Sequence, residues 1–212
     1  LLGCTLLFHT RGTAVTDTTI LTGGLHFGEG PRWHQGRLWF SDFYDHAVKS
    51  VDAAGQVRTE HSFEDQTSGL GWLPDGRMLV VSMRELAVLR QDGDNFVLHA
   101  DLSGLARHLC NDMVVDAAGR AYVGNFGFDL HNDAEPRPAE LIRVDPDGTA
   151  TVEDDEVMFP NGTVITPDGG TLIVGESFGG CLTAYDIAAD GSAVLVRTVS
   201  DAYLWPRRPG ES

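Results

Sequence analysis

Hydrophobic and polar positions alternate along this chain in short runs that turn residues separate. A unit made of an apolar stretch, a turn ending in Gly and a β-branched or aromatic run occurs four times, and its turns end at Gly36, Gly76, Gly119 and Gly169. Short runs of this composition between turns predict β-strands. No stretch shows a sustained helical period, so we expect an all-β protein.

Each unit also contains a second turn, which ends at Gly55, Gly93, Gly148 or Gly191. We expect strands at 37–40, 47–51 and 57–60, at 77–81, 87–90 and 96–100, at 120–123, 140–144 and 149–152, and at 171–174, 182–187 and 193–199. With the strand that enters each unit, this makes four short antiparallel strands in about 40–50 residues, the content of a β-propeller blade. A β-sandwich is the competing all-β fold, but it does not predict one double-turn unit four times over.

The pattern therefore predicts an all-β fold, a β-propeller with about four four-stranded blades in this chain. We assign residues 19–200 to the propeller and 201–212 to an irregular tail. We expect residues 1–18 to form an extension that does not belong to the fold. The acidic stretch 153–156 is predicted to be a solvated loop between the third and fourth blades.

Four polar residues hold the same place in the repeat. They lie seven or eight residues before the first-turn glycines, and they are Glu29, Ser68, Asn111 and Asn161. Asn-Gly and Ser-Gly are common turn dipeptides, which explains any one of them without a site. A propeller, however, lines its central channel with the first strand of every blade, so all four side chains should meet at one mouth of the channel. Carboxylate and amide oxygens suit Ca²⁺, Mg²⁺, Mn²⁺ or, less well, Zn²⁺, and we expect one such divalent ion there.

Charge and composition exclude several classes of binding partner. Acidic residues number 31 against 15 basic ones, a net charge of −16, which argues against nucleic acid or an anionic membrane as partner. A hydrophobic fraction of 42% excludes a disordered chain. Three widely spaced cysteines do not make a disulfide framework and favour a reducing, cytoplasmic location. No apolar run approaches the ~20 residues that a membrane span needs.

Three motifs then point to a family. Residues 29–33 with 36–42, residues 111–124, and residues 159–162 with 167–169 each resemble a motif of the SMP-30/gluconolactonase/LRE-like family. The resemblance covers roughly residues 19–198, and the combination is more specific than any single piece.

The resemblance implies a six-bladed propeller that binds one divalent metal on its axis and hydrolyses lactones, often sugar lactones. Glu29 and Asn161 would be metal ligands, with Glu29 also catalytic. Asn111 would lie beside the metal as a further ligand and catalytic group, in contact with the substrate or its water. Asp129 falls where some members place a substrate-contacting acid. Ser68 holds the same place in the repeat as Glu29, and we expect it to contact the substrate as well.

Two departures from the family pattern matter. Leu109 stands where some members carry Arg, which leaves the sugar-lactone specificity open. The family's third ligand, an Asp in the blade after Asn161, has no counterpart after Ser200, so Glu29 would have to be both ligand and base. We therefore expect a chain truncated after about four blades, with little or no lactonase activity. A non-catalytic propeller that serves as a binding scaffold is the alternative, and open blade edges predict self-association.

Overall fold

A computed structural model describes residues 19–200, which form sixteen strands and two short 3₁₀ helices. The strands are β1 (Gly28–His34), β2 (Arg37–Asp42), β3 (Ala47–Val51), β4 (Val57–Ser62), β5 (Thr67–Trp72), β6 (Met78–Ser82), β7 (Ala87–Asp92), β8 (Asn95–Asp101), β9 (Cys110–Val115), β10 (Ala121–Asn125), β11 (Ala139–Val144), β12 (Ala150–Val157), β13 (Pro160–Ile165), β14 (Thr171–Glu176), β15 (Cys181–Ile187) and β16 (Ala193–Ser200). The 3₁₀ helices are η1 (Phe43–Asp45) and η2 (Leu130–Asn132), and no helix in the described part could cross a membrane. The predicted extension 1–18 and tail 201–212 lie outside the described residues.

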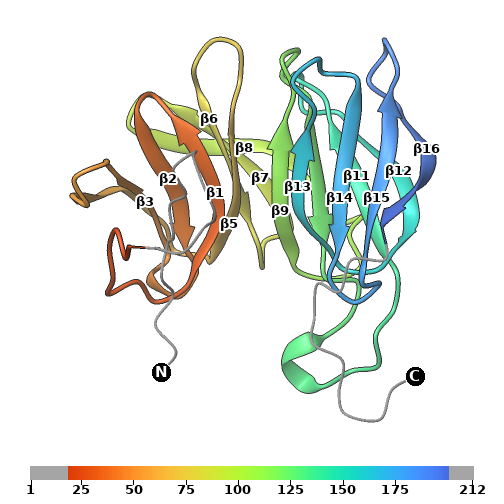
Figure 1. The fold of residues 1–212 in the computed structure, drawn as a ribbon, viewed down its shortest axis with the longest axis horizontal. Coiled ribbons are helices and arrows are strands. Elements are labelled where there is room, and N and C mark those ends of the chain that lie inside the picture. The colour runs from red at the N-terminus through yellow and green to blue at the C-terminus, as the bar shows by residue number, and fades with distance from the viewer. Residues whose placement is uncertain (1–18, 201–212) are drawn as a thin grey trace.

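The strands form four antiparallel sheets, each made of four consecutive strands in chain order. Figure 1 shows these blades following one another from orange to blue. The first strands of successive blades, β1, β5, β9 and β13, contact one another and form the inner wall. The predicted all-β propeller with four blades is thus confirmed. The six-bladed type stays a prediction.

The predicted strands are all present, and most extend one to four residues further than expected. The prediction of a loop at 153–156 is wrong, because β12 runs through the whole acidic stretch. Two of its carboxylates have partners that make a strand possible here: Glu153 pairs with Arg143, and Asp154 accepts a hydrogen bond from the Tyr185 hydroxyl at 2.9 Å.

Apolar side chains fill the spaces between blades. Val48, Leu70 and Val80 form a buried cluster of the first two blades. Tyr122, Leu141, Leu172 and Tyr185 form a buried cluster of the third and fourth blades. Because each blade buries its faces against its neighbours, the inner strands are held at fixed positions around the channel.

Buried and half-buried carboxylates hold the chain in place at the end where the first strands begin, which we call the mouth end. Asp42 accepts hydrogen bonds from the backbone N–H groups of His26 at 2.9 Å and Phe27 at 2.7 Å, just before β1. Glu140 accepts one from Arg107 before β9, and Glu176 accepts one from Met158 before β13. In the second blade the carboxylate itself precedes the inner strand. Asp65, before β5, accepts hydrogen bonds from Ser82 Oγ and from the backbone N–H of Arg84, each at 2.8 Å. These contacts fix where each inner strand begins.

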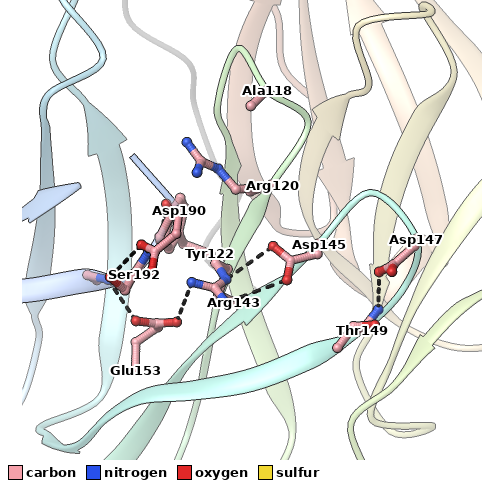
Figure 2. Close-up of polar contacts among 12 residues, drawn as sticks. Ala118, Arg120, Tyr122, Arg143, Asp145, Asp147, Thr149, Glu153, Asp190 and Ser192 are labelled. Carbon is pink, nitrogen blue, oxygen red and sulfur yellow. Dashed lines mark hydrogen bonds and ion pairs between the residues drawn. The ribbon is translucent and has the colours of Figure 1, made fainter. Parts of the chain in front are cut away.

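The opposite end carries a polar latch between the third and fourth blades (Figure 2). Arg143 Nη1 lies 3.0 Å from Glu153 Oε1, and Arg143 Nε lies 3.1 Å from Asp145 Oδ1. Glu153 Oε2 accepts a hydrogen bond from the backbone N–H of Ala193 at 2.7 Å. The Glu153 side chain is only 6% exposed, so the guanidinium of Arg143 compensates for its loss of water.

Replacing Arg143 by Ala is expected to lower the free energy of unfolding by about 2 kcal/mol, because Glu153 would keep a buried charge without its partner. Urea denaturation followed by circular dichroism measures the change. Arg58, which is exposed on β4, provides a matched control, and Arg58→Ala should shift stability by less than about 0.5 kcal/mol. Equal midpoints for the two variants would show that the latch contributes nothing.

Candidate functional site

The four register residues occupy one level of the inner wall. Glu29, Ser68, Asn111 and Asn161 are each the second residue of the first strand of a blade. The sequence predicted this common position from the distance between each residue and the turn glycine that follows it, and the structure shows the same position. Their chemical roles stay predictions.

Hydrogen bonds join all four blades at this level. Ser68 Oγ donates to Asn111 Oδ1 at 3.3 Å, and Asn111 Nδ2 donates to the carbonyl oxygen of Pro160 at 3.3 Å. Ser41 Oγ donates to the Ser68 carbonyl at 2.6 Å, which ties the first blade to the second. Ser68 is fully buried and Asn111 is 4% exposed, so these polar groups depend on one another. Asn111 keeps one N–H and one oxygen lone pair for other partners.

A charged pair joins the first blade to the third beside this chain of bonds. Arg32 Nη2 lies 3.0 Å from Asp112 Oδ1 and also donates to the Met113 carbonyl oxygen. Asp112 Oδ2 accepts from the backbone N–H of Thr163 at 3.0 Å. Arg32 and Asp112 both lie in the motifs that carry the resemblance, but sequence reasoning gave them no role. The available signal was their charge on strands that should line a channel.

Glu29 has a carboxylate with no ion pair in the part of the chain that the structure describes. Its pKa is raised to about 7, chiefly by burial and also by the neighbouring Asp112 carboxylate, while a hydrogen bond from the Gly30 backbone partly offsets both. At neutral pH this side chain is therefore close to half protonated. A cation placed beside it would favour the charged form.

Asn161 is half-buried, and its Oδ1 accepts a hydrogen bond from the N–H of Gly162 at 3.1 Å. Two residues earlier, Phe159 adopts a left-handed backbone conformation with φ of 58°, which is strained for an aromatic residue. Its ring stacks on Phe126 with centroids 4.6 Å apart, and its carbonyl accepts from the Ser177 N–H at 3.1 Å. This packing holds the strained turn that delivers Asn161 to the mouth.

No hydrogen bond or ion pair among the described residues joins Asp129 to the other predicted site residues. It caps η2, where its carboxylate accepts from Asn132 Nδ2 at 2.7 Å and from the Asn132 N–H at 3.2 Å. The side-chain bond from Asn132 is the main cause that holds its pKa below the ordinary value. His108 Nε2 lies 3.9 Å away, so Asp129 belongs to the rim beside the third blade. A role in substrate contact stays a prediction.

A second group of metal-ligand type lies in the first blade, at His26, Asp42 and Asp45. Lys49 Nζ already lies 2.7 Å from Asp42 Oδ2 and 2.5 Å from an Asp45 oxygen. The other Asp42 oxygen is taken by two backbone N–H groups. The ammonium group supplies the positive charge here, so this cluster does not fit a metal ion.

The fold and the mouth define a class: a β-propeller whose channel entrance presents one unpaired carboxylate and two amide side chains at the same level. The profile of the SMP-30/gluconolactonase/LRE-like region matches residues 27–204, and the chain belongs to this family.

Several relatives are similar along most of this chain. It is 27% identical over 188 residues to pentonolactonase XacC of Haloferax volcanii, covering 86% of this chain and 61% of the relative. A gluconolactonase of Xanthomonas campestris shows 25% identity and a TM-score of 0.66, covering 79% of this chain and 60% of the other. A calcium-binding regucalcin of Agrobacterium tumefaciens is alike in fold, with 21% identity and a TM-score of 0.67, covering 82% of this chain and 58% of the other. The chain thus spans about three-fifths of the length of these relatives.

Proposed function

We propose that the channel mouth is the site of a metal-assisted lactone hydrolysis. The observation that carries the proposal is the unpaired Glu29 carboxylate, with its pKa near 7, at the same level as Asn111 and Asn161. The names of two relatives, a pentonolactonase and a gluconolactonase, support a lactone as the substrate class. A binding scaffold would not need oxygen ligands in register at the mouth.

The residues at the mouth fit a hard or borderline divalent cation. Glu29 offers a carboxylate that burial holds partly protonated, so cation binding would release a proton and relieve the cost of its charge. Asn161 and Asn111 offer amide oxygens that each use one lone pair within the protein. Asp112 does not add a free carboxylate, because Arg32 and the Thr163 N–H hold its two oxygens.

The chain's own groups suggest how the reaction would proceed. A bound divalent ion would supply Lewis-acid activation of the lactone carbonyl. Glu29, held in its charged form by the cation, would accept the proton of the attacking water, and the free N–H of Asn111 would donate to a substrate oxygen. The new C–O bond to water forms, the ring C–O bond breaks, and the proton passes to the ring oxygen, which yields an open hydroxy acid. Leu109 is half-buried and has no charge that could bind a sugar hydroxyl, so we do not assign a particular lactone as the substrate.

The location of the protein is proposed on separate grounds. Cys110 is a buried free thiol, and burial raises its pKa to about 12, which makes it unreactive. A reduced cysteine of this kind suits a reducing compartment, and we propose the cytoplasm.

The described mouth supplies only one unpaired carboxylate, so the 212-residue chain is expected to bind its metal weakly, with a dissociation constant of about 0.1–1 mM. Calorimetric titration with Ca²⁺, Mn²⁺ and Zn²⁺ measures this. An indicator assay of acid release from gluconolactone and γ-butyrolactone, with and without the metal, should show slow turnover at most. Lack of saturable binding for all three metals would favour the scaffold, and fast turnover would contradict the weak-site expectation.

A further inference from the structure

A cavity of about 370 Å³, open to solvent on one side, lies where the outer strand of the first blade meets the β7–β8 hairpin of the second. This volume suits a small organic ligand. Its lining residues are Glu60, His61, Ser62, Phe63, Asp94, Asn95 and Phe96. None of them was singled out by the sequence, and the cavity lies outside the channel-mouth site.

Aromatic rings form one part of the cavity wall. Phe63 and Phe96 meet edge to face with centroids 4.9 Å apart, and His61 meets Phe96 in the same manner at 5.0 Å. Burial is the main cause that lowers the pKa of His61 and so favours its neutral ring, while Glu60 and Asp94 act in the opposite direction. Ring faces of this kind attract cations rather than anions.

The two carboxylates of the cavity lack counter-charges. Glu60 accepts a hydrogen bond from Ser50 Oγ, and neither Glu60 nor Asp94 has an ion pair with any residue that the structure describes. No Lys or Arg lines the cavity. The guanidinium of Arg37 reaches Ser50 Oγ at 2.6 Å, but its ion pair is with Asp52 at 3.2 Å.

The third blade offers a comparison for this position of the repeat. Register shifts leave Glu60 of β4 and Glu153 of β12 in corresponding bulges of their outer strands. Ser50 and Arg143 also correspond, since each pairs with the second residue of the outer strand. Glu153 is neutralised by Arg143 and bonded to the backbone of the next blade, as Figure 2 shows. Glu60 has Ser50 where Glu153 has a guanidinium.

The glycines between the third and fourth strands of each blade show a similar difference between the first interface and the later ones. A Cβ on Gly148 would lie 2.2 Å from the His99 carbonyl, and a Cβ on Gly191 would lie 2.4 Å from the Arg120 guanidinium. The corresponding Gly93 has nothing within 4 Å. The four described blades meet at three interfaces, which we call seams. Only the seam between the first and second blades has open space beside its hairpin glycine.

We propose that this seam is a binding site for a small organic cation, an alkyl guanidinium or ammonium. The cation would give Glu60 the counter-charge that Arg143 gives Glu153 in the third blade. Its charge would lie on Glu60 and Asp94, and its alkyl part against Phe63 and Phe96. The site needs neither the channel-mouth residues nor a metal ion.

The test uses the 212-residue chain with agmatine as the probe, followed by NMR shifts of the His61 ring and the Asn95 and Phe96 amides at 150 mM salt. We expect saturable shifts confined to the cavity, and none with neutral pentanamide or anionic pentanoate. Glu60→Gln and Asp94→Asn should each weaken binding by about five- to tenfold. Glu156→Gln, which removes an exposed carboxylate of β12 and the same unit of charge, should leave it unchanged.

Three outcomes would overturn the proposal. They are the absence of saturable shifts at the cavity, equal affinity in the Glu60→Gln and Glu156→Gln variants, and shifts spread over the whole acidic surface. Because the amide spectrum of each variant reports its fold directly, a loss of binding through unfolding would be recognised. The channel-mouth proposal is unaffected by any of these results.

Discussion

Glu29→Gln is expected to make the metal-free protein more stable at pH 8 and, at the same time, to weaken divalent-metal binding by at least about a hundredfold. The two effects have one cause. The folded protein holds the Glu29 carboxylate in a buried place beside Asp112, where its pKa rises to about 7 from an ordinary 4.5. Glutamine keeps the size and an acceptor oxygen but never carries the charge.

The sign follows from proton linkage. A carboxyl whose pKa is raised by folding stabilises the folded state when protonated, and that contribution is lost as pH rises from about 4.5 through about 7. Above pH 7 the wild type keeps a charge that folding disfavours, so Glu29→Gln should be more stable by about 1–3 kcal/mol at pH 8 and equal to the wild type at pH 4. Urea denaturation at several pH values, with a chelator present, measures the difference.

Glu64→Gln is the matched control for this pH dependence, because Glu64 is an exposed carboxylate. Its stability curve should follow the wild type at every pH. Parallel curves for Glu29→Gln and the wild type would refute the raised pKa. Unchanged calorimetric binding of Ca²⁺ or Mn²⁺ in Glu29→Gln would refute its role as a ligand, whatever its effect on stability.

Gly69→Ala is expected to destabilise the protein by more than about 3 kcal/mol, and to prevent folding at 37 °C. The inner strands β5 and β9 approach each other closely at this residue. A Cβ on Gly69 would lie 2.3 Å from the Met113 nitrogen, 2.5 Å from the Met113 Cβ and 2.8 Å from the Asp112 carbonyl carbon. Backbone atoms cannot move aside as the end of a side chain can, so the second and third blades would be forced apart.

Gly104→Ala is the control, since Gly104 has open space around it and no left-handed backbone. Its stability should stay within about 0.5 kcal/mol of the wild type or rise slightly. Circular dichroism and urea denaturation compare the two variants. A Gly69→Ala protein as stable as Gly104→Ala would mean that the inner strands lie further apart than the structure places them.

The regular part of this fold could be predicted because each strand is local in sequence. Turn glycines mark the boundaries, and the distance from such a glycine to the start of the inner strand fixed the level of Glu29, Ser68, Asn111 and Asn161. A single miscounted residue would have placed these side chains on the other face of the strand.

The features that the sequence did not predict depend on contacts between residues far apart in the chain. Arg32 and Asp112 are 80 residues apart, so no local pattern joins them. The acidic stretch at 153–156 has the composition of a loop, but Arg143 and Tyr185 make it a strand. Asp129 was placed by analogy with a variable loop, and its own neighbour Asn132 engages its carboxylate.

The confinement of each sheet to four consecutive strands has a consequence for synthesis on the ribosome. All ladder bonds of a blade join residues of one continuous segment, and even the Asp42 contacts to His26 and Phe27 stay within the first blade. A blade can therefore complete its backbone pairing as soon as its own segment has left the exit tunnel, without waiting for later residues. What must wait is the burial of its second face, so the newest blade should be the main target for a chaperone during translation.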